Sequence, residues 1–220
     1  MLLTKLTPEM PWMLPGGFIS QNENAEQAAT RILKSRTGVD KIYLNQFQTF
    51  SEPDRFSLRA LVSKLPLNKE EQSLVNKLPN RTISIGYFAL VNYELLEITG
   101  GEQEEETCWC GIDDLPDFAY DHGQIVIEAV EALRKEVYFR PIVYKLLPEK
   151  FTLPELQSLY EVILGKSLDR GSFNRKMLGW RIFERLEERR EGVAHRRPFL
   201  YKFDNLKYQT AIKQGLSFGM

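Results

Sequence analysis

The sequence has few of the residues that usually carry redox or metal chemistry. Its 220 residues include only two cysteines, Cys108 and Cys110, and only two histidines, His122 and His195. Two thiols without a second ligand pair make a poor zinc site. A spacing of two in a strand puts both cysteines on one face but gives no reasonable disulfide. We therefore expect two buried thiols in a reducing compartment.

Long apolar runs are also missing. The longest apolar stretches, such as residues 85–91, have the length of a strand and are too short to cross a bilayer. Met1 leads within a few residues to Thr7 and Pro8, without the apolar core of a signal peptide. We expect no membrane partner and a cytoplasmic location.

The charge is divided unevenly along the chain, although the net charge is only −1. Residues 141–220 hold 15 Lys and Arg against 9 Asp and Glu, a net charge of +6, which leaves −7 for residues 1–140. Pro141 and Pro148 lie where the balance changes. This asymmetry predicts two domains, 1–140 and 141–220, of which the second carries a modest basic surface for a polyanion.

The periodicity of the first part predicts a mixture of helices and strands. Apolar residues at three- and four-residue spacing predict helices over residues 24–36 and 121–136. Strands are expected at residues 1–6, 41–50, 81–93 and 106–112. Residues 51–80 are polar and irregular, with a short helix expected at residues 68–77; a loop of this length is usually functional.

Residues 15–39 read PGGFISQNENAEQAATRILKSRTGV. This stretch resembles the Nudix box, whose pattern is G-x5-E-x7-R-E-U-x-E-E-x-G-U with U aliphatic. The matching positions are Gly17, Glu23, Arg31, Leu33, Gly38 and Val39. The resemblance implies an α+β fold, a Nudix α/β/α sandwich with a mixed sheet.

Three positions depart from that pattern. Active Nudix hydrolases hold magnesium with glutamates where this chain has Ile32, Ser35 and Arg36. Magnesium needs hard oxygen ligands, usually carboxylates, to assist phosphoryl chemistry. We therefore expect no metal, no cofactor and no catalytic residues. Magnesium is expected as a cofactor only if the chain is a hydrolase, which is the alternative described below.

Candidate ligand-binding residues in this domain are Gly17, Glu23, Arg31 and Arg36. Glu23 and Arg31 either form a structural ion pair or contact the ligand. Arg36 either is solvated or takes one role of the metal and holds an anionic ligand. His122, after Asp121 at a helix start, has either a local structural role or a ligand contact.

The C-terminal part has the pattern of a helix-turn-helix. Thr152 and Glu155 form a capping box for a helix that ends near Leu164. A Gly165 turn follows, and Asp169 caps a second, basic helix. Strands are expected at residues 181–187 and 199–203, with a basic wing between them. Together these elements predict a winged helix-turn-helix domain.

Cations and polar side chains of the second helix and the wing are the candidate DNA contacts: Arg170, Ser172, Asn174, Arg175, Lys176, His195, Arg196 and Arg197. Residues at the start of a recognition helix face base edges, whereas wing cations contact phosphates. The alternative is a helical hairpin with a solvated charged face, diluted by Glu184, Glu187, Glu188 and Glu191.

Residues 81–91, 109–122 and 141–160 resemble the Nudix-related transcriptional regulators of bacterial sugar and NAD metabolism. That resemblance implies a homodimer that binds a double-stranded DNA operator. It also implies a small-molecule effector, either a sugar such as arabinose or an ADP-ribose-like nucleotide. We therefore predict a ligand-responsive transcription regulator with an inactive Nudix sensor.

Two alternatives remain. One is a divergent Nudix hydrolase acting on a nucleoside diphosphate sugar such as ADP-ribose, with substitute carboxylates from Glu26, Asp40 or residues 104–106. The other is a protein-interaction module that does not bind DNA.

Overall fold

The chain divides into two compact units. The computed structural model describes residues 1–39, 43–53, 55, 57, 59–60, 68, 75, 81–91, 106–192 and 197–215. One unit comprises residues 1–89 and 93–129, and the other comprises residues 90–92 and 130–220. The division falls inside one helix, so the domain boundary expected at residues 140 and 141 stays a prediction.

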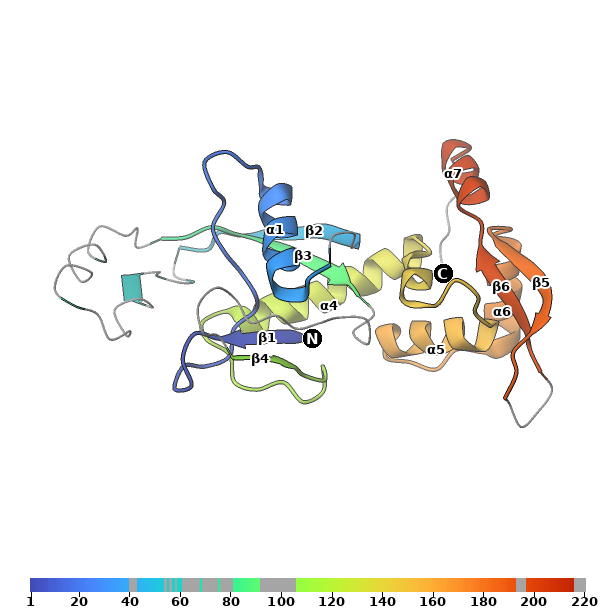
Figure 1. Ribbon diagram of the computed structural model, residues 1–220, viewed down its shortest axis with the longest axis horizontal. Helices are drawn as coiled ribbons and strands as arrows, with labels where there is room; N and C mark the ends of the chain where they lie inside the picture. Colours follow the sequence, from blue (N-terminus) through green and yellow to red (C-terminus); the bar gives the residue numbers. More distant parts are fainter. Residues whose placement is uncertain are drawn as a thin grey trace. The chain divides into compact units, whose positions relative to one another are not determined.

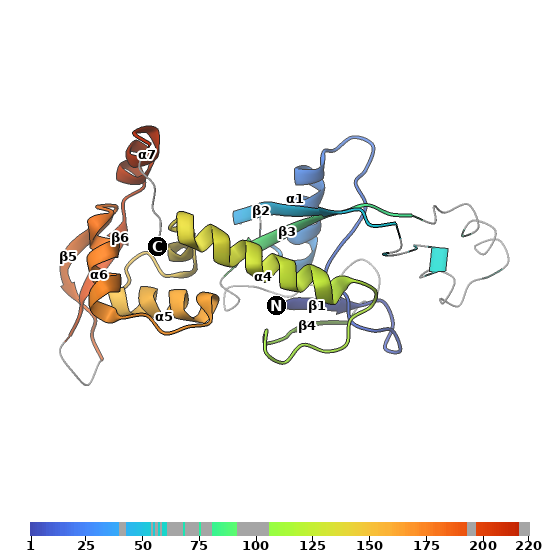
Figure 2. The same cartoon turned by 180° about the vertical axis from the view of Figure 1, so that it is seen from behind.

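The first unit is built from paired strands and two helices. Its elements are β1 (Leu2–Lys5), α1 (Ala25–Thr37), β2 (Tyr43–Phe50), β3 (Ser84–Leu90), β4 (Glu106–Trp109) and the beginning of α4 (His122–Phe139). Strands β1 and β4 pair antiparallel, and β2 pairs with β3. A parallel bridge joins Trp12 to Phe118, which makes the pairing mixed. In this unit β2 and β3 lie between α1 and the first turns of α4, as expected for an α/β/α layering, whereas β1 and β4 are drawn below these helices (Figures 1 and 2).

Helix α1 begins and ends where its sequence directs. The Asn24 side chain accepts from the Gln27 backbone N–H, and the Gln27 side chain accepts from the Asn24 N–H. This reciprocal pair satisfies two N–H groups that would otherwise lack partners. Gly38 adopts a left-handed conformation with φ 70° and closes the helix by donating to the Lys34 carbonyl.

An ion pair fixes the loop that leads into α1. Arg31 Nη2 lies 2.6 Å from Glu23 Oε1, and Arg31 Nε donates to Glu23 Oε2 at 2.9 Å. Arg31 also donates to the Phe18 carbonyl, and Glu23 accepts from the Ser20 backbone N–H. The hydrogen bonds from Arg31 and Ser20 lower the pKa of Glu23 to about 2. The structural ion pair expected from the sequence is confirmed.

A second ion pair joins segments far apart in the chain. Arg55 Nε donates to Asp121 Oδ2 at 2.7 Å, and Arg55 Nη1 donates to the Ser84 hydroxyl at 2.8 Å. The Arg55 side chain is only 5% exposed. Asp121 precedes the first residue of α4, where a negative charge favours the helix. The pair thus ties the segment after β2 to β3 and to the start of α4.

His122, the first residue of α4, has the structural role that was one of its two expectations. Its Nδ1 accepts from the backbone N–H of Leu14 at 2.9 Å, which joins the loop after β1 to the helix. Burial lowers the pKa of His122, because the charged imidazolium is poorly solvated there. The neutral ring is the form that accepts this hydrogen bond.

The second unit has the order of a winged helix. After the end of α4 its elements are η2 (Ile142–Leu146), α5 (Leu153–Leu164), α6 (Arg170–Gly179), β5 (Phe183–Arg189), β6 (Phe199–Phe203) and α7 (Asn205–Lys213). Strands β5 and β6 form an antiparallel hairpin, and Phe151 adds a bridge to Tyr201. The winged helix-turn-helix expected from the sequence is confirmed.

Local signals again place the helices of this unit. Thr152 and Glu155 make the expected capping box for α5, and Gly165 ends it with φ 66°. Asp169 caps α6 by accepting from the Ser172 backbone N–H. The two helices meet through Tyr160 and Phe173, whose rings pack edge to face at 5.4 Å.

Three expectations need correction. The two cysteine thiols are free and only half-buried, because β4 pairs with β1 alone among the described strands. They lie on one face, with their sulfurs 3.1 Å apart, and burial raises the pKa of Cys108 to about 11. Strand β5 ends at Arg189, two residues later than expected. Helices η2 and α7 were missed.

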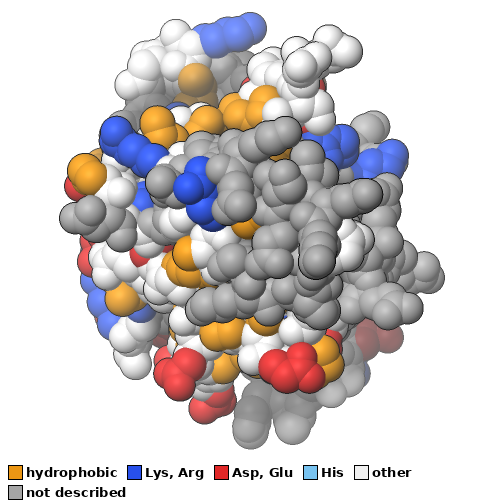
Figure 3. All heavy atoms as spheres, turned by 90° about the vertical axis from the view of Figure 1, so that its left-hand side faces the viewer, with side chains coloured by type: hydrophobic (Ala, Val, Ile, Leu, Met, Phe, Trp, Pro, Cys, Tyr) orange, Lys and Arg blue, Asp and Glu red, His pale blue; other side chains and the backbone are white. Residues whose placement is uncertain are grey.

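The remaining observations concern one expected helix, membrane-spanning segments and one face of the molecule. The helix expected at residues 68–77 lies mostly outside the described residues. No helix within the described ranges has the length and hydropathy needed to cross a bilayer. On the face in Figure 3, hydrophobic side chains reach the surface between separate acidic and basic groups.

We predict that Arg55→Ala lowers the free energy of unfolding by about 3 kcal/mol, because it leaves the Asp121 carboxylate partly buried without its cation. Urea denaturation measures the loss. Arg81→Ala is the matched control, since Arg81 is exposed, and it should cost less than about 1 kcal/mol. Equal losses for the two variants would show that the buried pair is not a special anchor.

We also predict that the stabilisation from Glu23 depends on pH. Because the folded state lowers the pKa of Glu23 to about 2, the contribution is complete above the usual carboxyl pKa and is lost as the pH falls toward that value. The difference in urea midpoint between the wild type and Glu23→Gln should therefore shrink from pH 6 toward pH 2. Glu9→Gln, at an exposed carboxylate, serves as the control. A difference that does not change with pH would refute the assignment.

Candidate functional site

The position of the first missing glutamate is filled by an apolar contact. A Cβ placed on Gly17 would lie 2.9 Å from Ile32 Cδ1, so the backbone of the loop packs directly on this side chain. A larger residue here would make the end of the Ile32 side chain shift. Ile32 therefore holds the loop against α1, where the Nudix pattern has a carboxylate.

The other two positions also lack carboxylates. The Ser35 hydroxyl donates to the Ile32 carbonyl at 2.8 Å, a bond within the helix. Arg36 is half-buried, and burial lowers the pKa of its guanidinium, which still carries a positive charge. Isoleucine, serine and arginine do not make the oxygen-rich ligand set that magnesium requires. No group of three or more His, Cys, Asp or Glu within the described ranges is arranged to hold a metal ion.

Glu23 and Arg31 are committed to each other at the loop before α1. The Glu23 side chain is 14% exposed, whereas the Arg31 side chain is 50% exposed. Arg31 thus has surface left for a ligand, although its guanidinium already binds Glu23 and the Phe18 carbonyl. The ligand-binding roles of Gly17, Glu23, Arg31 and Arg36 stay predictions.

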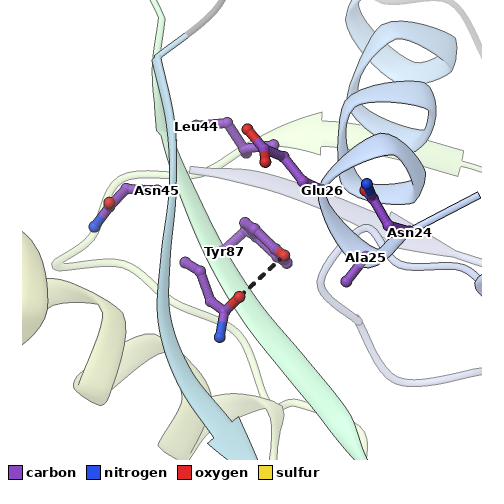
Figure 4. A pocket seen from close by; sticks show the side chains of 7 residues that line it. Asn24, Ala25, Glu26, Leu44, Asn45 and Tyr87 are labelled. Carbon is purple, nitrogen blue, oxygen red and sulfur yellow. Dashed lines mark hydrogen bonds between the residues drawn. The ribbon is translucent and has the colours of Figure 1, made fainter.

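A cleft of about 400 Å³ opens between the start of α1 and strands β2 and β3 (Figure 4). Most of the lining residues carry an amide, hydroxyl or carboxylate group. The full lining is Asn24, Ala25, Glu26, Leu44, Asn45, Gln46 and Tyr87. The Tyr87 hydroxyl donates to Gln46 Oε1 at 3.2 Å across the two strands. Burial, together with the charge of Glu26, raises the pKa of Tyr87. These groups suit the hydroxyls and amides of a polar small molecule.

The cleft residues were not among the ligand-binding predictions. Only Glu26 had been named, as a substitute carboxylate for the hydrolase alternative. Among the described residues, the cleft lining contains no second carboxylate. Asp40, Glu104 and Glu105 lie outside the described residues, and Glu106 is exposed at the start of β4. The missed residues come from three elements that are distant in sequence, so no local motif identifies them.

In the second unit, the predicted DNA-contacting residues of α6 lie beside its buried side. Phe173 and Met177 are buried and face the core. Arg170, Ser172 and Arg175 are exposed, whereas Asn174 and Lys176 are half-buried. A stable apolar side and an exposed cationic side are what a recognition helix requires.

The hairpin β5–β6 brings further cations to the surface. Arg197 is exposed and lies just before β6, whereas His195 and Arg196 lie outside the described residues. Arg190 binds Glu155 at 2.6 Å and so joins the hairpin to the start of α5. Arg189, which belongs to the basic wing expected from the sequence, and Arg185, which the sequence analysis did not select, both stack on the Phe199 ring. The DNA-contacting roles on α6 and in the wing stay predictions.

Known proteins match both units. Residues 1–129 match the NUDIX domain family, and residues 143–203 match the NrtR DNA-binding winged helix domain. A protein of Acinetobacter baylyi described as an ADPR responsive transcriptional repressor NtrR is 28% identical over 197 residues, which cover 87% of this chain and 69% of that protein.

Solved structures agree with these matches. The crystal structure of Shewanella oneidensis NrtR in complex with a 27mer DNA has a TM-score of 0.71 and 25% identity, covering 94% of this chain and 88% of that chain. The structure of Shewanella oneidensis NrtR alone has a TM-score of 0.68 and 26% identity, with 92% and 85% covered. The chain belongs to the Nudix domain family, and its second unit is a winged helix of the NrtR type.

Proposed function

We propose that this protein is a transcription regulator whose winged helix binds an operator and whose Nudix unit binds an effector without hydrolysing it. The observation that carries the proposal is α6. It is capped by Asp169, is anchored by Phe173 and Met177, and presents Arg170 and Arg175 to solvent. The match of residues 143–203 to a DNA-binding winged helix supports the same reading.

The effector we propose is an ADP-ribose-like nucleotide. The Acinetobacter relative is described as responsive to ADPR, which favours the nucleotide over a sugar such as arabinose. The cleft beside α1 offers polar groups for such a molecule. An effector changes DNA binding only if its affinity differs between the DNA-competent and DNA-incompetent states.

The absence of hydrolysis follows from the three substituted positions. Ile32 packs on Gly17, and neither Ser35 nor Arg36 supplies a carboxylate, so the box has nothing to hold magnesium against a diphosphate. Glu26 alone favours the hydrolase alternative, because it lines the cleft. A single carboxylate at another position of α1 is a weak substitute for the three of the Nudix pattern. The predicted homodimer fits a two-fold operator.

If the winged helix binds DNA, the purified protein should slow the electrophoretic migration of a DNA fragment from upstream of its own coding region. Arg170→Ala/Arg175→Ala should weaken that binding by tenfold or more, since each close contact to a base edge or phosphate contributes about 1–3 kcal/mol. Electrophoretic retardation and fluorescence anisotropy measure the affinity.

Lys5→Ala/Arg81→Ala is the matched control, because it removes the same charge from the first unit and should leave DNA affinity within about twofold. If the wild-type protein binds no upstream fragment, DNA binding is wrong. If both variants lose affinity equally, overall charge accounts for the effect and α6 does not.

The sensor part predicts that ADP-ribose binds the protein and survives. Calorimetry should detect a saturable binding isotherm. Incubation with magnesium should release no AMP or ribose phosphate above the level without protein, because the box lacks its metal ligands.

Arabinose in the same calorimeter tests the sugar alternative. Glu26→Gln is the control for any residual activity. Magnesium-dependent turnover that disappears in Glu26→Gln would make the protein an enzyme with a substitute carboxylate, and the inactive-sensor proposal would fail.

A further inference from the structure

We propose that Arg185, Arg189 and Phe199 form a binding site for DNA phosphates on the β5–β6 hairpin, here called the arginine clamp. The inference rests on the proposed DNA-binding function and adds residues that the helix-turn-helix pattern does not identify. The proposed phosphate site lies on the paired strands β5 and β6, and not in the loop that connects them.

Both guanidinium groups stack on one aromatic ring. The Arg189 Cζ lies 3.9 Å from the centre of the Phe199 ring, and the Arg185 Cζ lies 4.5 Å from it. A register shift between Arg185 and Arg189 breaks the regular pairing of β5 with β6. This irregularity lets two arginines four positions apart reach the same ring, because a bulge re-aims the side chains that follow it.

Neither of the two cations forms an ion pair with a described residue. Within the described residues, neither Arg185 nor Arg189 has a carboxylate within ion-pairing distance, and both side chains are exposed. Three other cations around the hairpin are paired: Lys150 with Glu188, Lys202 with Glu184, and Arg190 with Glu155. The clamp is therefore a place on the hairpin where positive charge stays available for a partner.

Two such cations close together cost free energy when nothing binds between them. Stacked on one ring, they lie within about 9 Å of each other, inside the Debye length of about 10 Å at 0.1 M salt. An anion that binds both removes this repulsion. Phosphate oxygens suit the flat guanidinium fork, which donates two parallel hydrogen bonds.

The ring also prepares the arginines for binding. Stacking restricts side chains that would otherwise lose much rotamer freedom on binding. Arg189 is held further by donating to the Arg197 carbonyl at 3.1 Å, a bond that uses one of its five N–H donors. The remaining donors of both arginines stay available. Because phosphate contacts position a protein without reading bases, the clamp should act equally on all DNA sequences.

The test compares two double variants of the full chain. Arg185→Gln/Arg189→Gln removes the clamp, and Lys150→Gln/Lys202→Gln removes the same charge from lysines that are already paired. Affinities for the upstream fragment and for a duplex of random sequence are measured over a series of salt concentrations. Circular dichroism and thermal midpoints check that each variant is folded.

We expect the clamp variant to bind both duplexes about tenfold or more weakly at 0.1 M salt, with the ratio between them unchanged. Its plot of log affinity against log salt should be shallower by about 2, since each lost phosphate contact removes about 0.9 from the slope. The lysine variant should change the slope by less than half as much. Phe199→Leu, which keeps both charges, should weaken binding severalfold because the arginines are no longer held.

An unchanged salt slope in Arg185→Gln/Arg189→Gln overturns the clamp, as does equal behaviour of the two double variants. A fall confined to the upstream fragment means that these arginines read sequence, which also overturns a phosphate site. If the wild-type protein binds neither duplex, the proposed DNA-binding function fails and the clamp with it. If the wild-type protein binds DNA and Arg185→Gln/Arg189→Gln binds it as tightly as the wild type, the clamp is wrong and the proposed DNA-binding function stands.

Discussion

The buried ion pair between Arg55 and Asp121 is the constraint on which the first unit depends most. A buried charge is tolerated only when it is paired and hydrogen-bonded, and Arg55 meets this condition with Asp121 and the Ser84 hydroxyl together. The pair fixes the start of α4 against the strands. Helix α4 then continues past Ala129 into the second unit. The orientation of the first turn of α4 in this unit is thus set by an interaction between segments that are far apart in the chain.

The Nudix box shows how a catalytic helix can be retained for its structural value. Its loop still closes through Glu23 and Arg31, and Gly38 still ends the helix. Ile32 now contributes packing against Gly17, where a cluster of carboxylates would repel one another without a metal. The loop–helix–loop is therefore held by packing and by the Glu23–Arg31 ion pair, without the like-charge repulsion of three neighbouring carboxylates.

Interactions that span three or four residues could be predicted from the sequence, and interactions between distant segments could not. The caps at Asn24, Thr152 and Asp169 follow from residue types at fixed spacing. The pair of Arg55 with Asp121 spans 66 positions and has no local signal. The cleft was missed for the same reason, since Glu26 and Tyr87 meet only in the fold. Helix α7 was missed because Ala211 is its single buried residue, which leaves almost no apolar periodicity.

Ion pairing decides which basic side chains of the second unit remain available to bind DNA. The sequence shows acidic residues among the basic ones, which favours a diluted surface for DNA. In the fold, Glu184 and Glu188 each bind a lysine around the hairpin. Exposed ion pairs add little stability, but each one cancels the field of both partners at short range. Arg170 and Arg175 on α6 and the two arginines on the Phe199 ring are exposed, so part of the net positive charge lies on the two elements of a winged helix that approach DNA.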